Sequence, residues 1–308
     1  MDKARREQVV FIIGPTAIGK TRLAATLARR LHGEIISCDS MQVYKGMHIL
    51  SQGPSRKERG LAKHHLVGIL DPKREYSAAA FIKKAAPIIE AIIKRKKVPI
   101  VVGGSGLYVK ALVDGLFPSP PADMKFRKRM QAFVSRCGSK RLHDRLAKID
   151  PFSASGIHPN DVRRIIRALE LFETTGRTMT ELKATTKGLK DRYDVRIFGL
   201  IAPRERIYSR IDSRVDKMFA SGAVREARAL ARKRMSKTSR EALGFKEIAD
   251  YLDGEYGLEC AKDLVKMNTR RFAKRQLTWF RPDNRIKWHD VTRNTEAKII
   301  NKIMKEVR

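Results

Sequence analysis

The sequence predicts an α/β fold in which a parallel β-sheet is flanked by helices. Short apolar runs rich in β-branched residues, such as "VVFII" at 9–13, are typical of buried strands. Each early run ends at glycine or small polar residues, and a stretch with the apolar spacing of a helix follows before the next run. This alternation favours right-handed βαβ units and therefore a parallel sheet.

The individual elements follow from the same patterns. Residues 20–33 carry a helical stripe of apolar side chains that ends at a glycine. Residues 76–97 predict a long helix in which Ser77 is a suitable N-cap, and Pro87 should kink or split it. A helix is also expected in 106–116. Further strands are expected at 34–40, 98–104, 194–202 and, for a short last one, within 284–291.

The stretch "FPSPPAD" at 117–123 interrupts this alternation. From there to about residue 195 the patterns are helical, with no convincing strand. We therefore expect a helical insertion domain at 119–195. The catalytic core would be formed by residues 1–118 and 196–308.

Composition narrows the class of protein. The chain has 308 residues, with 66 Lys and Arg against 33 Asp and Glu, a net charge of +33. Such a surface attracts polyanions, and nucleic acid is the first candidate partner. Three widely spaced cysteines offer no metal or disulfide framework, which fits a reducing cytoplasm. No apolar run approaches the roughly 18 residues of a membrane span.

The segment "GPTAIGKT" has the pattern G-x-x-x-x-G-K-[ST] between a predicted strand and a predicted helix. It indicates a P-loop NTPase-like core, in which backbone N–H groups and the helix N-terminus hold phosphate. Lys20 would supply a full charge, and the Thr21 hydroxyl suits Mg²⁺. The expected phosphate-binding residues are Gly14, Pro15, Thr16, Ala17, Ile18, Gly19, Lys20 and Thr21.

Two other loops should meet this one, because ligands bind beyond the carboxyl ends of parallel strands. The loop after the 98–104 strand has Gly103 and Gly104 where a nucleotide hydrolase needs an acid to hold Mg²⁺ and order water. This favours a transferase in which diphosphate leaves. Asp39, after the second strand, could accept a proton from a nucleophile. It could equally cap a turn.

Seven segments in this order resemble the tRNA dimethylallyltransferases, also called tRNA isopentenyltransferases: "GPTAIGKT", "DSMQVYKGM", "HHLVGILDP…YSAAAF", "VVGGSGLYVKAL", "IHPNDVRRIIRALE", "ALGFKE…YLDG" and "TRRFAKRQLTWFR". The resemblance covers about residues 9–281. It implies transfer of a dimethylallyl group from dimethylallyl diphosphate to N6 of the adenosine 3′ of the anticodon. It also implies Mg²⁺ and binding of the tRNA anticodon stem-loop. We expect a monomer.

The resemblance also implies roles for particular residues. Asp39 would be the general base, and Arg214 would reach the diphosphate together with Lys20 and Thr21. Ser105 stands where the family usually has Thr. The implied tRNA-binding residues are Asp39, Ser40, Met41, Gln42, Ser105, Arg127, Arg163, Arg164, Ile165, Ile166 and Arg167.

Some of these assignments compete with structural interpretations. Arg163, Arg164 and Arg167 fall on one side of a helix, which by itself is typical of a solvated charged face. The resemblance favours RNA contact instead. The segment 269–281 has five basic residues and no acid, and we expect its aromatic side chains to pack in the core while its basic face meets RNA phosphates.

Three other functions remain to be distinguished from the tRNA enzyme. A small-molecule P-loop kinase would use Lys20 to hold ATP. A transferase that prenylates free adenine nucleotides would share the loop without a large basic face. A non-catalytic RNA-binding module would need neither the intact loop nor Asp39.

Overall fold

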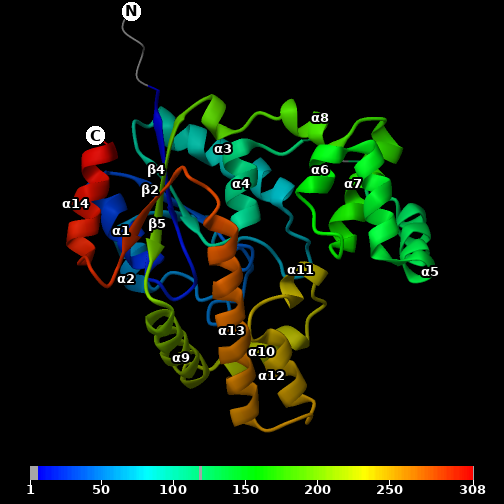
Figure 1. Cartoon of the computed structure of the whole chain (residues 1–308). Coiled ribbons are helices and arrows are strands. Elements are labelled where there is room, and N and C mark those ends of the chain that lie inside the picture. The colour runs from blue at the N-terminus through cyan, green and yellow to red at the C-terminus, as the bar shows by residue number, and fades with distance from the viewer. Residues whose placement is uncertain (1–5, 118–119, 308) are drawn as a thin grey trace, which may run out of the picture. The chain divides into compact units, whose positions relative to one another are not determined.

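The structure, a computed structural model, describes residues 6–117 and 120–307 (Figure 1). Its contacts divide the chain into two units, called here the sheet unit (residues 1–113 and 189–308) and the helical unit (114–188). The expected boundary between 118 and 119 lies outside the described residues. The second expected boundary, 195/196, falls inside a strand that begins at Asp194, and a short 3₁₀ helix at Leu189–Asp191 precedes that strand in the sheet unit.

The sheet unit contains a six-stranded parallel sheet in the order β3-β2-β4-β1-β5-β6. Its strands are β1 (Gln8–Ile13), β2 (Glu34–Cys38), β3 (His64–His65), β4 (Pro99–Gly103), β5 (Asp194–Ile201) and β6 (Ile286–Asp290). The predicted fold class is confirmed. The β-branched runs of β1, β2 and β4 are almost wholly buried, as expected for strands covered on both faces.

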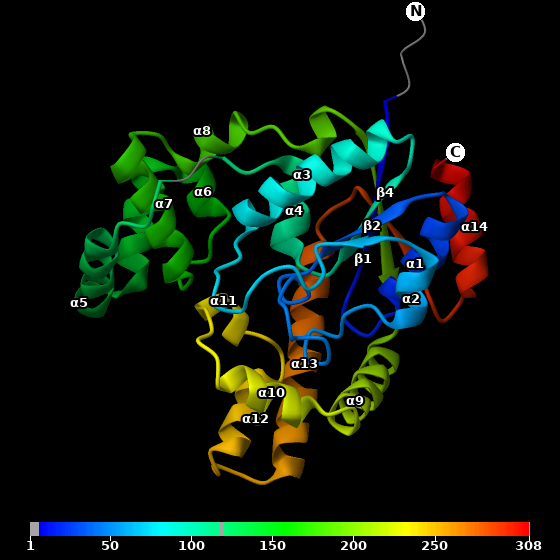
Figure 2. The same ribbon diagram turned by 180° about the vertical axis from the view of Figure 1, so that it is seen from behind.

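Helices cover both faces of the sheet (Figures 1 and 2). Helix α1 (Lys20–Arg30) packs beside α14 (Glu296–Val307) on one face, and α3 (Ala78–Lys94) and α4 (Gly106–Asp114) lie on the other. The order of the strands explains this, because right-handed crossovers that move in opposite directions along a sheet place their helices on opposite faces. Helix α2 (Arg56–Leu61) is a short capped helix before β3.

The predicted cap of α3 is confirmed, since Ser77 accepts a hydrogen bond from the Ala80 N–H. The predicted split at Pro87 is wrong, because one helix runs through the proline. Phe81 and Ala85 before the proline, and Ile89 and Ile92 after it, are all buried in the core. This packing on both sides of Pro87 offsets the hydrogen bond that proline cannot donate.

Five further helices of the sheet unit follow β5, and most of them lie in the lower part of Figure 1. They are α9 (Arg204–Ala220), α10 (Ala223–Ala231), α11 (Lys237–Arg240), α12 (Phe245–Leu252) and α13 (Leu258–Phe280). Helix α13 packs against α9 and α12. No helix within the described residues combines the length and the apolar character of a membrane span.

The helical unit has its own core. It contains α5 (Met124–Ile149), α6 (Pro151–Ser155), α7 (Val162–Thr175) and α8 (Met179–Ala184). Helix α5 is broken at Gly138, which has φ 83° and ψ 160°. The break lets both halves of α5 contribute to one apolar cluster with α7, in which Phe126 and Leu142 meet Ile165.

A buried carboxylate holds the amino end of β2 in place, at the end of the strand opposite the Asp39 loop. Glu34, at the start of β2, is 3% exposed and bonds to His65, Arg95 and Lys97 at 2.7, 3.0 and 3.1 Å. Burial alone would raise its pKa, but the three partners hold the pKa at about 2. These contacts tie β2 to β3 and to the chain that enters β4.

Candidate active site

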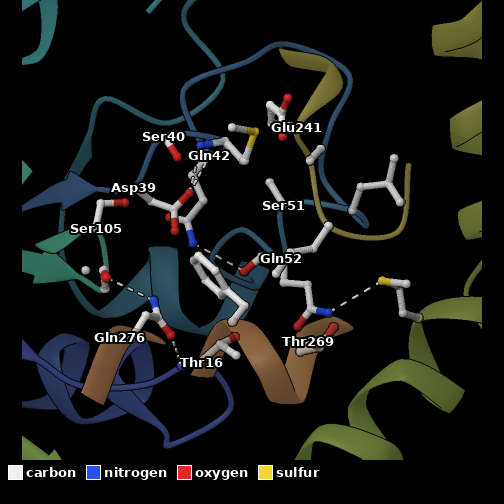
Figure 3. Close-up of a pocket in the computed structure, with 18 of the residues that line it drawn as sticks. Thr16, Asp39, Ser40, Gln42, Ser51, Gln52, Ser105, Glu241, Thr269 and Gln276 are labelled. Atoms are coloured by element: carbon white, nitrogen blue, oxygen red, sulfur yellow. Dashed lines mark hydrogen bonds between the residues drawn. The ribbon is translucent and has the colours of Figure 1, made fainter. Parts of the chain in front are cut away.

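The carboxyl ends of three adjacent strands lie side by side. In the sheet register Ile13 is opposite Gly103, and Gly103 is also opposite Cys38. The residues that follow these positions open a cavity of about 690 Å³ within the sheet unit (Figure 3). Its wall includes Thr16 from the phosphate loop, Asp39 from the loop after β2 and Ser105 from the loop after β4. The predicted meeting of the three loops is therefore confirmed.

Lys20 is the first residue of α1 and lies at the base of the cavity. Its ammonium group donates to the carbonyl oxygens of Gly14 and Pro15 at 2.9 and 2.7 Å. Burial and the charge of Arg214 together lower the pKa of Lys20 to about 7, although the charge of Asp39 opposes them. The charged form of Lys20 is therefore costly here unless an anion joins it.

Arg214 reaches the same region from α9. Its Nη1 donates to the Thr16 hydroxyl at 3.1 Å. Burial lowers the pKa of Arg214 to about 10, while the charge of Asp39 raises it. Two partly buried cations thus lie near Asp39, and this arrangement suits an anionic ligand such as diphosphate.

Asp39 lines the cavity and also shapes its own loop. Its Oδ1 accepts hydrogen bonds from the backbone N–H groups of Met41 and Gln42 at 2.8 and 3.2 Å. The Gln42 side chain is held in turn by Ser37, whose hydroxyl donates to Gln42 Oε1 at 2.8 Å. The capping role that the sequence left open is therefore present. It occupies one carboxylate oxygen and does not exclude a role as a base.

The glycines after β4 leave no room for an acidic side chain. A Cβ on Gly103 would lie 1.9 Å from the carbonyl oxygen of Cys38, because β2 and β4 are paired there. A Cβ on Gly104 would lie 2.1 Å from Gln276 Nε2. The backbone of the neighbouring strand thus occupies the position where a hydrolase would place its water-ordering acid.

The side of the cavity that comes from the late helices carries both apolar and charged side chains. Its apolar residues include Val215, Met218, Leu243, Phe245, Val265 and Phe272. The Arg275 guanidinium lies 5.7 Å from the centre of the Phe272 ring. The expectation that the aromatics of 269–281 are core residues holds for Phe280, which is 3% exposed. It is wrong for Phe272, which lines the cavity, and for Trp279, which is 40% exposed.

Two polar atoms on the cavity wall have no hydrogen-bond partner within the described chain. They are Gln52 Oε1 and His64 Nε2, and both are buried. Sequence reasoning missed Gln52, because no motif marks it. It becomes visible only where its loop folds over the cavity and Gln42 Nε2 reaches the Gln52 carbonyl at 3.4 Å.

Not every predicted loop residue faces this cavity. Thr16, Lys20, Thr21, Ser40, Met41, Gln42 and Ser105 do. Ala17, Ile18 and Gly19 instead border a second cavity of about 640 Å³ between α1, α9 and α14. Among the described residues no group of three or more His, Cys, Asp or Glu side chains is arranged to hold a metal ion.

Two of the predicted RNA-contacting residues of the helical unit, Arg127 and Arg167, bind a buried carboxylate. Glu170 is 0% exposed and accepts from Arg127 Nε and Nη2, both at 2.8 Å, and from Arg167 Nη1. It also accepts from the Asp123 N–H at 2.8 Å. These partners lower the pKa of Glu170 although burial opposes them. Arg127 and Arg167 are therefore held in place rather than freely solvated.

The same helix corrects part of the predicted RNA surface. Ile165 and Ile166 are 0% and 5% exposed and pack in the core of the helical unit, so their side chains cannot meet RNA. Arg163 and Arg164 are exposed, and Arg164 Nε lies 3.3 Å from Asp161. The helical period explains the difference, because the two isoleucines point to the side of α7 opposite the exposed arginines.

Comparisons with known proteins agree with this geometry. The family model described as IPP transferase matches residues 42–283, and that described as isopentenyl transferase matches residues 7–68. The chain is 44% identical over 300 residues to a tRNA dimethylallyltransferase of Halothermothrix orenii, covering 96% of this chain and 92% of the relative. It is 45% identical over 302 residues to that of Carboxydothermus hydrogenoformans, covering 97% of each.

Solved structures give the same result. A full-length tRNA isopentenylpyrophosphate transferase from Bacillus halodurans matches with a TM-score of 0.72 and 41% identity, covering 98% of this chain and 97% of that one. A eukaryotic dimethylallyltransferase acting on tRNA matches with a TM-score of 0.80 and 28% identity, covering 98% and 80%.

Proposed function

Since this chain belongs to the IPP transferase family of tRNA dimethylallyltransferases, we propose that it transfers a dimethylallyl group from dimethylallyl diphosphate to N6 of the adenosine 3′ of the tRNA anticodon. The observation that carries this proposal is the cavity itself. It combines a phosphate loop, the cations Lys20 and Arg214, the Asp39 carboxylate, and apolar side chains such as Met218 and Phe245. These features match, in turn, a diphosphate leaving group, an amine that must lose a proton and a five-carbon apolar group.

The reaction assigns one role to each group. The bond between C1 of the donor and the diphosphate oxygen breaks, and the electron pair leaves with diphosphate. The adenine N6 lone pair forms the new C–N bond, and Asp39 takes the N6 proton as that bond forms. An exocyclic adenine amine is a poor nucleophile because its lone pair is delocalised, so a positioned base matters.

Lys20 and Arg214 stabilise the charge that develops on the leaving oxygen. Both are held in place before the reaction, Lys20 by loop carbonyls and Arg214 by the Thr16 hydroxyl. Cations fixed in a buried site stabilise developing charge more strongly than mobile ones in water. Apolar side chains of the cavity such as Met218 and Phe245 accommodate the dimethylallyl group and keep water from the allylic carbon.

Mg²⁺ fits the residues present. The Thr21 hydroxyl lines the cavity directly beside Lys20, and Mg²⁺ commonly takes few protein ligands and completes its shell with phosphate oxygens and water. When bound, the ion would neutralise part of the diphosphate charge.

The acceptor base must leave the anticodon loop to enter the cavity. We assign its contacts to the turn from Asp39 to Gln42 and to Ser105, whose side chain retains a hydroxyl. The exposed cations of α7, with Arg127 and Arg167 held by Glu170, would bind RNA phosphates. We further propose that the enzyme acts as a monomer in the cytoplasm, where its three free cysteines would stay reduced.

One assay tests the proposed function. The protein is incubated with labelled dimethylallyl diphosphate and Mg²⁺, together with tRNA, AMP or ATP alone. Label in tRNA, at an adenosine next to the anticodon, supports the proposal. Label in AMP but not in tRNA would favour the enzyme of free nucleotides. Rapid hydrolysis of ATP would favour the kinase class, against which the filled position at Gly103 already argues.

The RNA surface predicts a salt-dependent affinity. Replacing Arg163 and Arg164 together by Gln should weaken tRNA binding and flatten the dependence of log affinity on log salt by roughly one to two units, because each lost phosphate contact releases one counterion fewer. Affinity for the donor should be unchanged. The measurement is tRNA binding at several salt concentrations.

A matched control removes two exposed cations elsewhere. Lys83 and Lys84 on α3 are both exposed, and the Lys83→Gln, Lys84→Gln pair loses the same formal charge. Arg167 is left intact, because its removal would deprive the buried Glu170 of a partner and disturb the fold. If the dependence of log affinity on log salt were the same for wild type and the α7 variant, Arg163 and Arg164 would be solvated side chains that do not contact RNA.

A further inference from the structure

Gln276 joins the two loops that carry the donor and acceptor sites. It lies in α13 and is 7% exposed. Its Oε1 accepts a hydrogen bond from the Thr16 backbone N–H at 2.8 Å, and its Nε2 donates to the Gly104 carbonyl at 2.9 Å. Figure 3 shows both bonds, with the amide between Thr16 and the loop that leads to Ser105. One side chain thus bridges the phosphate loop and the loop after β4.

The chemistry of the site requires an amide at this position. One partner is a donor and the other an acceptor, so the side chain must offer an acceptor and a donor at once. An ionised carboxylate offers only acceptors and a lysine only donors. A side chain at position 104 would displace the Gln276 amide, because a Cβ there would lie 2.1 Å from the Gln276 nitrogen. Residues 104 and 276 are therefore fitted to each other.

Thr16 is held at two points as a result. Its N–H is bound by Gln276, and its hydroxyl is bound by Arg214 at 3.1 Å. The Thr16 N–H therefore donates its hydrogen bond to a side chain of α13 and not to a phosphate. The orientation of Arg214, the second cation of the cavity, depends on where Gln276 holds Thr16.

We propose that Gln276 is a positioning residue that sets the separation between the diphosphate site and the acceptor site. Both polar atoms of its side chain are bonded to the protein itself, to the Thr16 N–H and the Gly104 carbonyl. It fixes Thr16, and through Thr16 the arginine at the leaving group, relative to the Gly104–Ser105 segment that faces the acceptor. Displacing reacting groups by about 1 Å can cost about 100-fold in rate. This inference rests on the proposed function.

The test is Gln276→Met, which keeps the length of the side chain and removes both hydrogen bonds. We expect kcat to fall about 10- to 100-fold, while KM for tRNA and the affinity for tRNA change less than about twofold, because the RNA surface is untouched. Thr278→Ala is the matched control on the same helix, since the Thr278 hydroxyl bonds only within the helix, to the Lys274 carbonyl, in the described contacts. It should retain wild-type kcat.

A double-mutant cycle separates positioning from general loss of structure. Gln276→Met and Arg214→Lys should be non-additive in kcat, because both act on Thr16. Additive losses, or a Gln276→Met enzyme with wild-type kcat, would overturn the inference. If Gln276→Met does not fold, Gln276→Asn serves instead: it keeps the amide but is one methylene too short for both partners, and wild-type kcat there would overturn the inference equally. An inactive wild type would instead contradict the proposed function.

Discussion

Replacing Asp39 by Asn should lower kcat by about two to four orders of magnitude, which is the usual contribution of a positioned general base. Asn keeps an oxygen that can accept from the Met41 and Gln42 N–H groups, so the turn that Asp39 caps should survive. The change therefore removes the basic oxygen and the charge while preserving the loop. Single-turnover transfer to tRNA measures the chemical step.

The charge of Asp39 has a second effect that the assay must separate. It raises the pKa of Lys20, so Asp39→Asn should lower that pKa further below about 7. Near pH 8 a loss of rate could then arise from a neutral Lys20, and this contribution shrinks as the pH falls toward 6. A loss of rate at both pH values supports the base. A defect confined to high pH, or turnover within a few-fold of wild type at pH 6, would leave Asp39 a capping and electrostatic role only.

Replacing Lys20 by Met should lower kcat/KM by about two to three orders of magnitude, because the ammonium group meets the diphosphate in the ground state and also stabilises the charge on the leaving oxygen. Both donor affinity and kcat should fall. Lys20→Arg is the control that keeps the charge with a different shape. Donor affinity is measured with inorganic diphosphate, and kcat with saturating donor.

The lowered pKa of Lys20 makes a separate, thermodynamic prediction. At about pH 8 a group with a pKa of about 7 is mostly neutral, and a bound diphosphate should raise that pKa and protonate it. Wild type should therefore take up more protons on binding diphosphate than Lys20→Met does. Calorimetry in two buffers of different ionisation enthalpy measures the difference. Equal uptake by the two proteins would contradict the assignment of Lys20 to the diphosphate.

Local sequence patterns were sufficient for the sheet. The strands β1, β2 and β4 begin and end within two residues of the predicted positions, because β-branched runs flanked by glycine and small polar residues have few alternatives. The convergence of the three loops also followed, since parallel strands bring their carboxyl ends to one edge. The two-residue strand β3 was not predictable, because His64 and His65 form no apolar run.

The contacts that organise the site were not predictable, because they join residues far apart in the chain. Gln276 and Thr16 are 260 residues apart in the sequence, and no local sequence pattern predicts that they form a hydrogen bond. Glu170 lies in a helix rich in charge, yet it is fully buried by partners such as Arg127. A motif therefore predicted an RNA-contacting segment, while only the fold shows which of its side chains are exposed.

The glycines at the end of β4, Gly103 and Gly104, limit which activities this fold could acquire by mutation. With the Cys38 carbonyl 1.9 Å from any Cβ at position 103, the chain cannot gain a catalytic acid there by one substitution. Strands β2 and β4 would have to move apart first, at the cost of the pairing that places Asp39 in the cavity. Because β2 and β4 pair so closely, an acidic residue at position 103 would require a change in the backbone first. A single side-chain substitution would therefore not convert this transferase into a nucleotide hydrolase of the same architecture.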